Sequence, residues 1–216
     1  MRTVAVIGNG PDNHIPDLTT YTNDIDVWIG ADGGVLTLIK QGITPDYAVG
    51  DFDSIDISDK KKINNHAPHI LTYPTQKNET DLELAIYEAM KLKPNKIYLF
   101  GITGGRLDHA LINIQLLSQI LEQDIQGIII DKWNYIELTK PGTHTIHQTK
   151  HYSYISFIPL TNIVSNLTLS HFLYPLTNFE LHYGSTRCIS NELIGTTGTF
   201  SYDNGSLLVI KSCDPS

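Results

Sequence analysis

The chain has 216 residues, and its 23 acidic side chains outnumber its 15 basic ones, which gives a formal net charge of −8 at pH 7. Hydrophobic residues make up 41% of the sequence, enough for a buried core and too many for a disordered chain. The acidic balance and the lack of a basic cluster exclude a protein that wraps nucleic acid. No apolar run approaches the roughly 20 residues that cross a membrane, so neither nucleic acid nor a membrane is an expected partner.

The N-terminus and the cysteines indicate the cellular compartment. Residues 1–8 contain too short an apolar stretch for a signal peptide and are better explained as a first strand. The two cysteines, Cys188 and Cys213, form no C-x-x-C pattern, which excludes a cysteine-rich zinc site. We therefore expect two reduced thiols in a cytoplasmic globular protein.

The first 132 residues alternate short β-rich runs with helical segments. The expected strands are Thr3–Gly8, Asp26–Gly30, Tyr47–Gly50, His69–Tyr73, Lys96–Gly101 and Gly127–Asp131. The run Thr80-Asp81-Leu82-Glu83 has the form of a capping box and predicts a helix that continues to about Leu92. Apolar side chains at three- and four-residue steps predict one further apolar helix stripe, made of Leu107, Ala110, Leu111, Ile114, Leu117 and Leu121.

This alternation predicts an α/β fold with a doubly wound, mostly parallel sheet and flanking helices over residues 1–132. Residues 133–216 have strand-like runs separated by turn residues, which predicts an antiparallel β-sandwich. The runs are Thr143–His147, Tyr152–Ile158, Leu181–Tyr183 and Leu207–Ile210. We therefore expect two domains, 1–132 and 133–216.

Four polar or glycine-rich segments follow predicted strands, at the sheet edge where ligands of parallel sheets bind. They are Ala31–Gly34, Gly50–Ser54, Pro74–Asp81 and Gly101–His109. In an extended turn Asp51 and Asp53 point the same way and can share Mg²⁺, which prefers carboxylates and binds together with substrate phosphates. The alternative is an Asx turn whose carboxylates bond to nearby amides.

Asp32 and Asp81 converge on the same predicted edge, and a cluster of acids without a cation is unfavourable. Asp81 also suits the first turn of a helix, where an acid complements the helix dipole. Lys77 lies in a segment too polar for the core, so it is either a phosphate contact or an ordinary solvated lysine.

The segment Gly101-x-x-Gly104-Gly105-Arg106 lets backbone amides approach a phosphate at a helix N-terminus, and Arg106 adds donors that match phosphate oxygens. Asp108 and His109 either orient Arg106 or a phosphate, or are an ordinary helix-start acid and a half-buried histidine. Gly8-Asn9-Gly10 after the first strand is a weaker signal for a phosphate-binding loop, and a simple turn is the favoured alternative. No G-x-S-x-G motif or cysteine–histidine neighbour supports a nucleophile, which leaves phosphate chemistry with a divalent cation.

Five motifs stand in a familiar order: A31-D-G-G, P45-D-Y-A-V-G-D-F-D-S54, K77-x-x-T-D81, G101-x-x-G-G-R-x-D-H109 with Asn113, and S190-N-E192. In these motifs the chain resembles the thiamine pyrophosphokinase family over essentially its whole length. The resemblance implies an α/β domain that binds the nucleotide, a β-sandwich that binds thiamine, and a homodimer. It also implies transfer of the terminal diphosphate of ATP to the thiamine hydroxyl, with release of AMP.

The resemblance also implies roles for single residues. Asp51, Asp53 and Asp81 match the acids for Mg²⁺ and catalysis, and Arg106, Lys77 and Thr80 match the phosphate-handling positions. The nucleotide site would further include Asp32, Thr103, Gly104, Gly105, Asp108 and His109. Ser190, Asn191 and Tyr174 match the thiamine-contacting stretch, in a pocket completed across the dimer. The segment Ser170–Leu176 departs from the family's Gly-Leu-Lys-aromatic run and keeps only its aromatic, Tyr174.

Three other functions fit parts of this pattern. A diphosphokinase for another hydroxymethyl heterocycle, such as a pterin, would use the same residues. A D-x-D glycosyltransferase would use the acids to hold the metal of a nucleotide-sugar but has no role for Arg106 and Lys77. A non-catalytic thiamine- or nucleotide-binding module would leave the acidic cluster unexplained.

Overall fold

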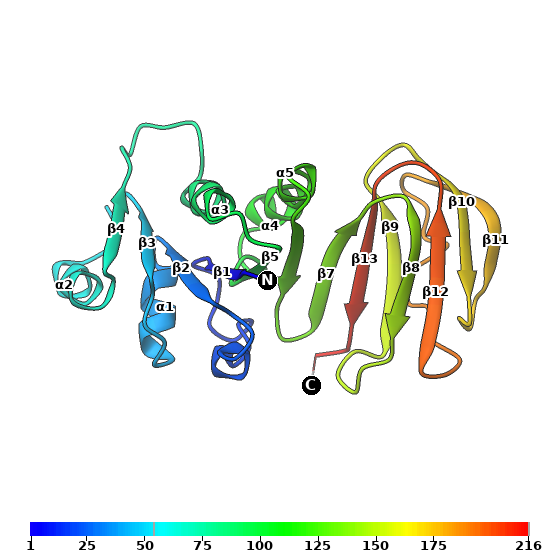
Figure 1. Cartoon of the computed structure of the whole chain (residues 1–216), viewed down its shortest axis with the longest axis horizontal. Coiled ribbons are helices and arrows are strands. Elements are labelled where there is room, and N and C mark those ends of the chain that lie inside the picture. Colours follow the sequence, from blue (N-terminus) through cyan, green and yellow to red (C-terminus); the bar gives the residue numbers. More distant parts are fainter. Residues whose placement is uncertain (54, 216) are drawn as a thin grey trace. The chain divides into compact units, whose positions relative to one another are not determined.

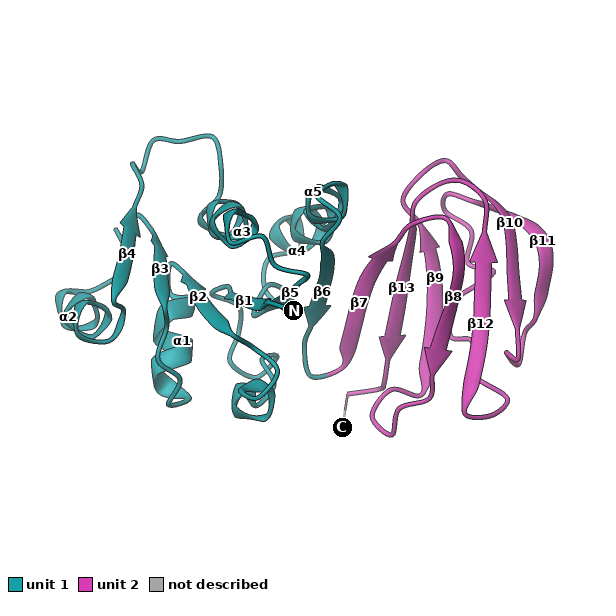
Figure 2. Ribbon diagram, viewed as in Figure 1, with its two compact units in different colours: residues 1–132 teal, residues 133–216 magenta. Residues whose placement is uncertain are grey.

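The computed structural model describes residues 1–53 and 55–215, so Ser54, at the end of the aspartate turn, lies outside the described residues. The chain divides into two compact units, residues 1–132 and 133–216 (Figure 2). Within the described residues no helix is both long and apolar enough to cross a membrane.

The first unit is a parallel sheet flanked by helices. Its strands are β1 (Thr3–Ile7), β2 (Val27–Ala31), β3 (Tyr47–Gly50), β4 (His69–Thr72), β5 (Lys96–Phe100) and β6 (Gln126–Ile130). Its helices are the short 3₁₀ helix η1 (Leu18–Tyr21), α1 (Gly34–Lys40), α2 (Ile57–His66), α3 (Asp81–Lys91), α4 (Leu107–Gln115) and α5 (Leu117–Glu122). Figure 1 shows α1 and α2 on one side of this sheet and α3, α4 and α5 on the other. The predicted fold class is confirmed for this unit.

The strand order β4-β3-β2-β1-β5-β6 positions the site. The chain builds the sheet outwards from β1 to β4, and then returns to the other side of β1 to add β5 and β6. Both neighbours of β1 run parallel to it, and the chain leaves β1 towards β2 but leaves β5 towards β6, so the two connections run in opposite directions from this point. In open α/β sheets this switch point is where ligands bind.

Helix α3 begins where the capping box predicts. The Thr80 hydroxyl accepts a hydrogen bond from the Glu83 amide at 3.2 Å, and one face of the helix buries Leu84, Ala85, Ile86 and Ala89. The Glu83 carboxylate accepts hydrogen bonds from the Tyr87 hydroxyl at 2.9 Å and from the side-chain amide (Nε2) of Gln119 at 3.3 Å. The cap is thus made by Thr80, while Glu83 connects α3 to α5.

The expectation of one continuous apolar stripe after residue 107 is wrong. The helix is interrupted at Leu116, which separates α4 from α5. Leu117 is buried, whereas Leu107 and Leu111 are 72% and 54% exposed. The periodicity identified a helical region, but it did not show which part of the stripe packs on this chain's own core.

The second unit is an antiparallel β-sandwich, as expected. Its strands are β7 (Asn134–Thr139), β8 (Gly142–His147), β9 (Tyr154–Pro159), β10 (Ile163–Ser170), β11 (Leu176–His182), β12 (Thr197–Tyr202) and β13 (Leu207–Ser212). They form the layers β7-β13-β9 and β11-β10-β12-β8. The sequence patterns do not predict β7, β10 and β12.

Side chains from both layers meet in one core, which includes Phe157, Phe172, Phe200 and Cys188. The buried Tyr202 hydroxyl donates to the Thr139 carbonyl at 2.6 Å, so this polar group has a partner inside the core. Both cysteines are free, and burial raises the pKa of the Cys188 thiol to about 11.

Candidate functional site

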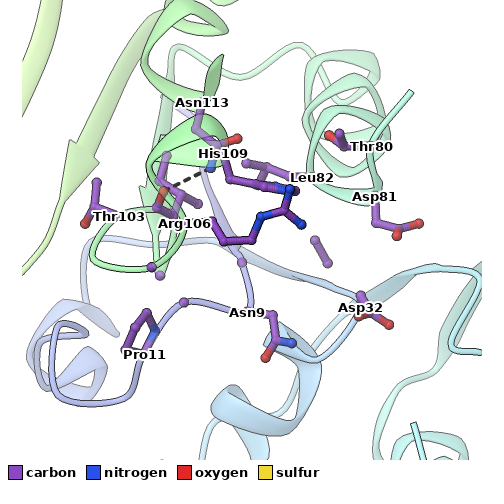
Figure 3. Close-up of a pocket in the computed structure, with 16 residues that line it drawn as sticks. Asn9, Pro11, Asp32, Thr80, Asp81, Leu82, Thr103, Arg106, His109 and Asn113 are labelled. Carbon is purple, nitrogen blue, oxygen red and sulfur yellow. Dashed lines mark hydrogen bonds between the residues drawn. The ribbon is translucent and has the colours of Figure 1, made fainter. Parts of the chain in front are cut away.

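A pocket of about 660 Å³ lies at the switch point between β1 and β5 (Figure 3). The turns after β1, β2 and β5 line it, together with the first turn of α3 and one side of α4. Residues from three of the four loops expected at this sheet edge therefore line the pocket: Ala31–Gly34, Pro74–Asp81 and Gly101–His109. The turn after β1 also lines it.

Glycines allow the loops after β1 and β5 to pack backbone against backbone. The Gly10 amide donates to the Gly101 carbonyl at 2.7 Å, and a Cβ on Gly10 would lie 2.6 Å from that same oxygen. Gly101 has a φ of +63°, which glycine adopts without the steric cost that other residues incur. The turn Gly8-Asn9-Gly10 is therefore part of the pocket wall as well as a turn.

Two of the predicted acids meet at a lysine. Lys77 Nζ lies 3.1 Å from Asp51 Oδ2 and 2.9 Å from Asp81 Oδ1, and the Lys77 and Asp51 side chains are only 11% and 13% exposed. The hydrogen bond from Lys77 is the main cause that lowers the pKa of Asp51. Burial lowers the pKa of Lys77, but its hydrogen bonds to Asp81 and Asp51 outweigh that effect and raise it. A positive charge therefore stabilises these acids in this structure.

Asp53 follows in the same turn. Its amide donates to Asp51 Oδ1 at 3.2 Å, and the Asp53 residue is exposed. Asp51 therefore accepts a bond from a local amide on one oxygen, as in an Asx turn, and contacts the Lys77 ammonium with its other oxygen.

The donor set of the aspartate turn fits a magnesium ion. Among residues 1–53 and 55–215 no group of three or more histidine, cysteine or acidic side chains is arranged to hold a metal. Mg²⁺ does not need one, because it commonly takes one or two carboxylates and completes its shell with water and substrate phosphates. Asp51 and Asp53 supply such a pair.

Two residues at the strand ends have left-handed backbone conformations. Asp32 has φ 46° and Phe52 has φ 54°, and such conformations in residues other than glycine cluster at functional sites. The Asp32 amide donates to the Val49 carbonyl at 2.8 Å, which ties the turn after β2 to the end of β3. Figure 3 shows Asp32 and Asp81 on the same side of the pocket.

Arg106 extends across the middle of the pocket (Figure 3). Its Nε lies 3.1 Å from Asp108 Oδ1 and its Nη2 lies 2.5 Å from Asp108 Oδ2. This two-point contact raises the pKa of Arg106 and lowers that of Asp108. Asp108 thus orients Arg106, and it also accepts a bond from the His109 amide at 2.9 Å.

Two buried side chains fix the loop after β5 from behind. Asn113 Nδ2 donates to the Ile102 carbonyl at 2.9 Å, and the Thr103 hydroxyl donates to Asp131 Oδ2 at 2.7 Å. The sequence patterns predict no role in the site for Asp131, nor for the pocket-lining Asn9, Pro11 and Leu82. The strand order would have pointed to the turn after β1, but that order is not readable from local patterns.

The predicted thiamine-contacting residues lie together in the second unit. Asn191 is only 2% exposed, and its side chain bonds to the Tyr174 amide at 3.0 Å and to the Tyr174 carbonyl at 2.9 Å. Ser190 is exposed, and its amide donates to the Ser156 hydroxyl at 2.9 Å. Tyr174 itself is 61% exposed. Asn191 therefore holds the backbone that presents Tyr174.

A doubly wound sheet with a switch-point pocket, and with acids, a lysine and an arginine after its strands, is typical of α/β enzymes that act on phosphate-containing substrates. Residues 18–129 match the family described as thiamin pyrophosphokinase, catalytic domain, and residues 143–207 match thiamin pyrophosphokinase, vitamin B1 binding domain. The chain belongs to the thiamine pyrophosphokinase family and is a transferase.

Members of this family match the chain over nearly its whole length, in sequence and in structure. The thiamine pyrophosphokinase of Bacillus subtilis (strain 168) is 46% identical over 214 residues, covering 99% of this chain and 100% of the relative. A crystal structure of thiamine pyrophosphokinase from B. subtilis matches with a TM-score of 0.94 at 45% identity, covering 99% and 100% of the two chains. That from Geobacillus thermodenitrificans matches with a TM-score of 0.89 at 41% identity, covering 99% of each. These matches do not favour the pterin or glycosyltransferase alternatives.

Proposed function

We propose that this chain transfers the terminal diphosphate of ATP to the hydroxyl of thiamine, giving thiamine diphosphate and AMP, with Mg²⁺ at Asp51 and Asp53. The observation that carries the proposal is the contact of Lys77 with both Asp51 and Asp81 beside a switch-point pocket. Such a cluster of opposite charges suits a polyphosphate and its cation, because each charged group can exchange its partner for the ligand.

In this proposal the thiamine oxygen attacks the β-phosphorus of ATP, and the bond to the α-phosphate oxygen breaks so that AMP leaves. Positioning and electrostatic stabilisation supply most of the catalysis in such transfers. Arg106 and Lys77 stabilise the charge of the phosphates, and Thr80 and the Gly104–Gly105 turn add donors. Asp81 takes the proton of the thiamine hydroxyl. A bound Mg²⁺ would neutralise phosphate charge.

We further propose a homodimer that completes the thiamine site. Exposed apolar side chains support this, because such groups in a globular chain mark surfaces that bind a partner. They include Leu107, Leu111 and Ile112 on α4, and Leu173, Tyr174 and Ile194 around Asn191. Two free thiols and ATP as co-substrate favour a cytoplasmic location.

The decisive experiment is incubation of the purified chain with ATP, Mg²⁺ and thiamine, followed by chromatography of the products. We expect AMP and thiamine diphosphate in equal amounts, and no product when a chelator removes the metal. A hydroxymethylpterin in place of thiamine should release no AMP. ADP as the product, or AMP release only with the pterin, would contradict the proposal. Light scattering should give the mass of a dimer.

A further inference from the structure

The segment that ends at Asn191 pairs with β9 as an additional short strand. Asn191 exchanges two backbone hydrogen bonds with Ile155, at 2.7 Å and 3.0 Å, and the Phe157 amide donates to the Cys188 carbonyl at 2.9 Å. Between these paired positions β9 has one residue and the segment has two. An extra residue of this kind is a β-bulge, which bends the strand and redirects the side chain that it carries.

Ser156 holds this bulge from the β9 side. It is the single residue opposite Ile189 and Ser190, it is only 7% exposed, and its hydroxyl accepts a hydrogen bond from the Ser190 amide at 2.9 Å. Ser190 has a left-handed backbone conformation with φ 55°, which is unfavourable in a residue other than glycine and persists only where the surroundings impose it. The Ser156 hydroxyl therefore pairs the amide of the strained residue.

The backbone on both sides of Ser190 is fixed. The Cys188 side chain lies in the core of the β-sandwich, and Asn191 is 2% exposed. Besides its two bonds to Tyr174, the Asn191 side chain accepts one from the Glu192 amide at 2.9 Å. Ser190 itself is exposed, so its side chain is accessible to a ligand while its backbone has one defined position.

The exposed side chains on either side of Asn191 suit a ligand with a flat ring. Tyr174 is 61% exposed, Leu173 is 49% exposed and Ile194 is 68% exposed. Their backbones belong to the same small network, because Asn191 bonds to Tyr174 and the Leu173 amide donates to the Glu192 carbonyl at 2.8 Å. Apolar and aromatic side chains with a few fixed polar groups are the usual surroundings of a heterocyclic ligand.

We propose that Ser156 is a positioning residue for thiamine binding: its hydroxyl holds the bulge that presents the Ser190 hydroxyl to the substrate. Ser156 does not touch thiamine in this scheme and acts through Ser190 alone. The inference rests on the proposed function, because it takes thiamine as the ligand of the second unit. Without the Ser156 hydroxyl the Ser190 amide loses its partner, and the bulge is free to leave the conformation that recognition of a ligand group requires.

The test is a double-mutant cycle on thiamine affinity. Isothermal titration calorimetry of the full chain uses thiamine together with α,β-methylene-ATP, whose bridge between the α- and β-phosphorus does not break. We expect Ser156→Ala and Ser190→Ala each to weaken thiamine binding about five- to tenfold. The double variant should bind no more weakly than Ser190→Ala, because Ser156 has no effect once the Ser190 hydroxyl is gone. Ser156→Ala should lower the melting temperature in both backgrounds.

Two controls separate positioning from folding. Ser156→Thr keeps the hydroxyl in a strand and should keep the wild-type affinity for thiamine. Thr161→Val removes a bond of the same kind in the same unit, since the Thr161 hydroxyl accepts from the Ser206 amide at 3.0 Å. This variant should lower the melting temperature and leave thiamine affinity unchanged. An equal loss of affinity in Thr161→Val and Ser156→Ala would overturn the inference, because both would then act through stability.

The inference also fails if Ser156→Ala binds thiamine as well as the wild type does, or if the losses of the two single variants multiply in the double variant. Wild-type affinity of Ser190→Ala would overturn it even if Ser156→Ala does not fold. A wild-type chain that binds no thiamine and forms no AMP would instead contradict the proposed function itself.

Discussion

The two units hold their polar side chains in different ways. In residues 1–132 the charged groups at the strand ends pair with one another, as Lys77 does with Asp51 and Asp81 and Arg106 with Asp108. In residues 133–216 the buried polar groups bond mainly to backbone, as Asn191 does at Tyr174 and Tyr202 at Thr139. A side-chain ion pair can exchange a partner for a ligand, whereas a side chain that satisfies buried backbone cannot leave without local unfolding. Substitution of these paired charged groups should therefore affect catalysis, whereas substitution of a buried polar group in the core of the second unit, as at Tyr202, should affect stability alone.

The largest effect is expected for Asp53→Asn. This change removes one carboxylate of the aspartate turn and keeps its shape, so kcat should fall by about three decades or more, with unchanged circular dichroism. Asp59→Asn is the matched control, because Asp59 is an acid on α2 that pairs with Lys62, and its kcat should stay near the wild-type value. Near-normal turnover of Asp53→Asn would end the metal assignment.

Lys77→Met should come next, with kcat/KM lowered by about 100-fold as a phosphate contact is lost. It also leaves Asp51 and Asp81 without their shared cation. The melting temperature should therefore fall in the absence of metal, and Mg²⁺ should raise it more than in the wild type. Lys91→Met is the control, because Lys91 pairs with Glu88 on α3 and is largely exposed. An equal response of both variants to Mg²⁺ would contradict the assignment.

The same pair predicts a pH dependence of stability. Lys77 holds the pKa of Asp51 below its ordinary value of 3.8, so Asp51 stabilises the folded state above that pH. The stabilisation is lost as the pH falls through the lowered folded-state pKa. Urea unfolding between neutral and acid pH should therefore show a smaller loss of stability in Lys77→Met than in the wild type. If the stability of both proteins changed with pH in the same way, the contact between Lys77 and Asp51 would not contribute to the pH dependence of stability.

A smaller, selective effect is expected for Tyr174→Ala. If this exposed ring contacts thiamine, its removal should raise KM for thiamine about tenfold, the usual scale for one aromatic contact, and leave KM for ATP unchanged. Tyr183→Ala removes a comparably exposed tyrosine of the same unit and should change neither constant. If Tyr174→Ala raised KM for ATP and not KM for thiamine, Tyr174 would not be a thiamine contact.

The smallest effect is expected in the core of the second unit. Tyr202→Phe removes a hydroxyl that donates to the Thr139 carbonyl at 2.6 Å and should lower the free energy of unfolding by about 1–2 kcal/mol. Denaturant titration measures this, and both KM values should stay constant. A change in kcat of Tyr202→Phe without loss of stability would contradict the expectation that this buried hydroxyl contributes to stability alone.

Local signals in the sequence were sufficient for much of the fold. The capping box located the start of α3 because Thr80 acts within its own turn. Alternation of strands and helices gave the parallel sheet, and the loops after its strands gave the acids that meet at Lys77. The strand β12 was missed because small and polar residues, such as Thr197, Gly198 and Ser201, hide its alternation.

Local sequence patterns do not show which other segment each helix or strand packs against or pairs with. The exposed part of the predicted stripe at Leu107 and Leu111 looks apolar in sequence whether it faces this chain or another. The pocket wall formed by Gly8 to Pro11 depends on β5 lying next to β1, a pairing of residues more than 90 positions apart. Asp131 was missed for the same reason, since only the folded sheet puts it behind Thr103.

The burial of Cys188 has a practical consequence. With a thiol pKa of about 11, only about one molecule in ten thousand carries the reactive thiolate at neutral pH, and core side chains shield that sulfur. Alkylating reagents should therefore modify the more accessible Cys213 first. Modification of Cys188, detected as a mass shift, would then require the β-sandwich to open. The rate of this modification would therefore measure how often the β-sandwich opens.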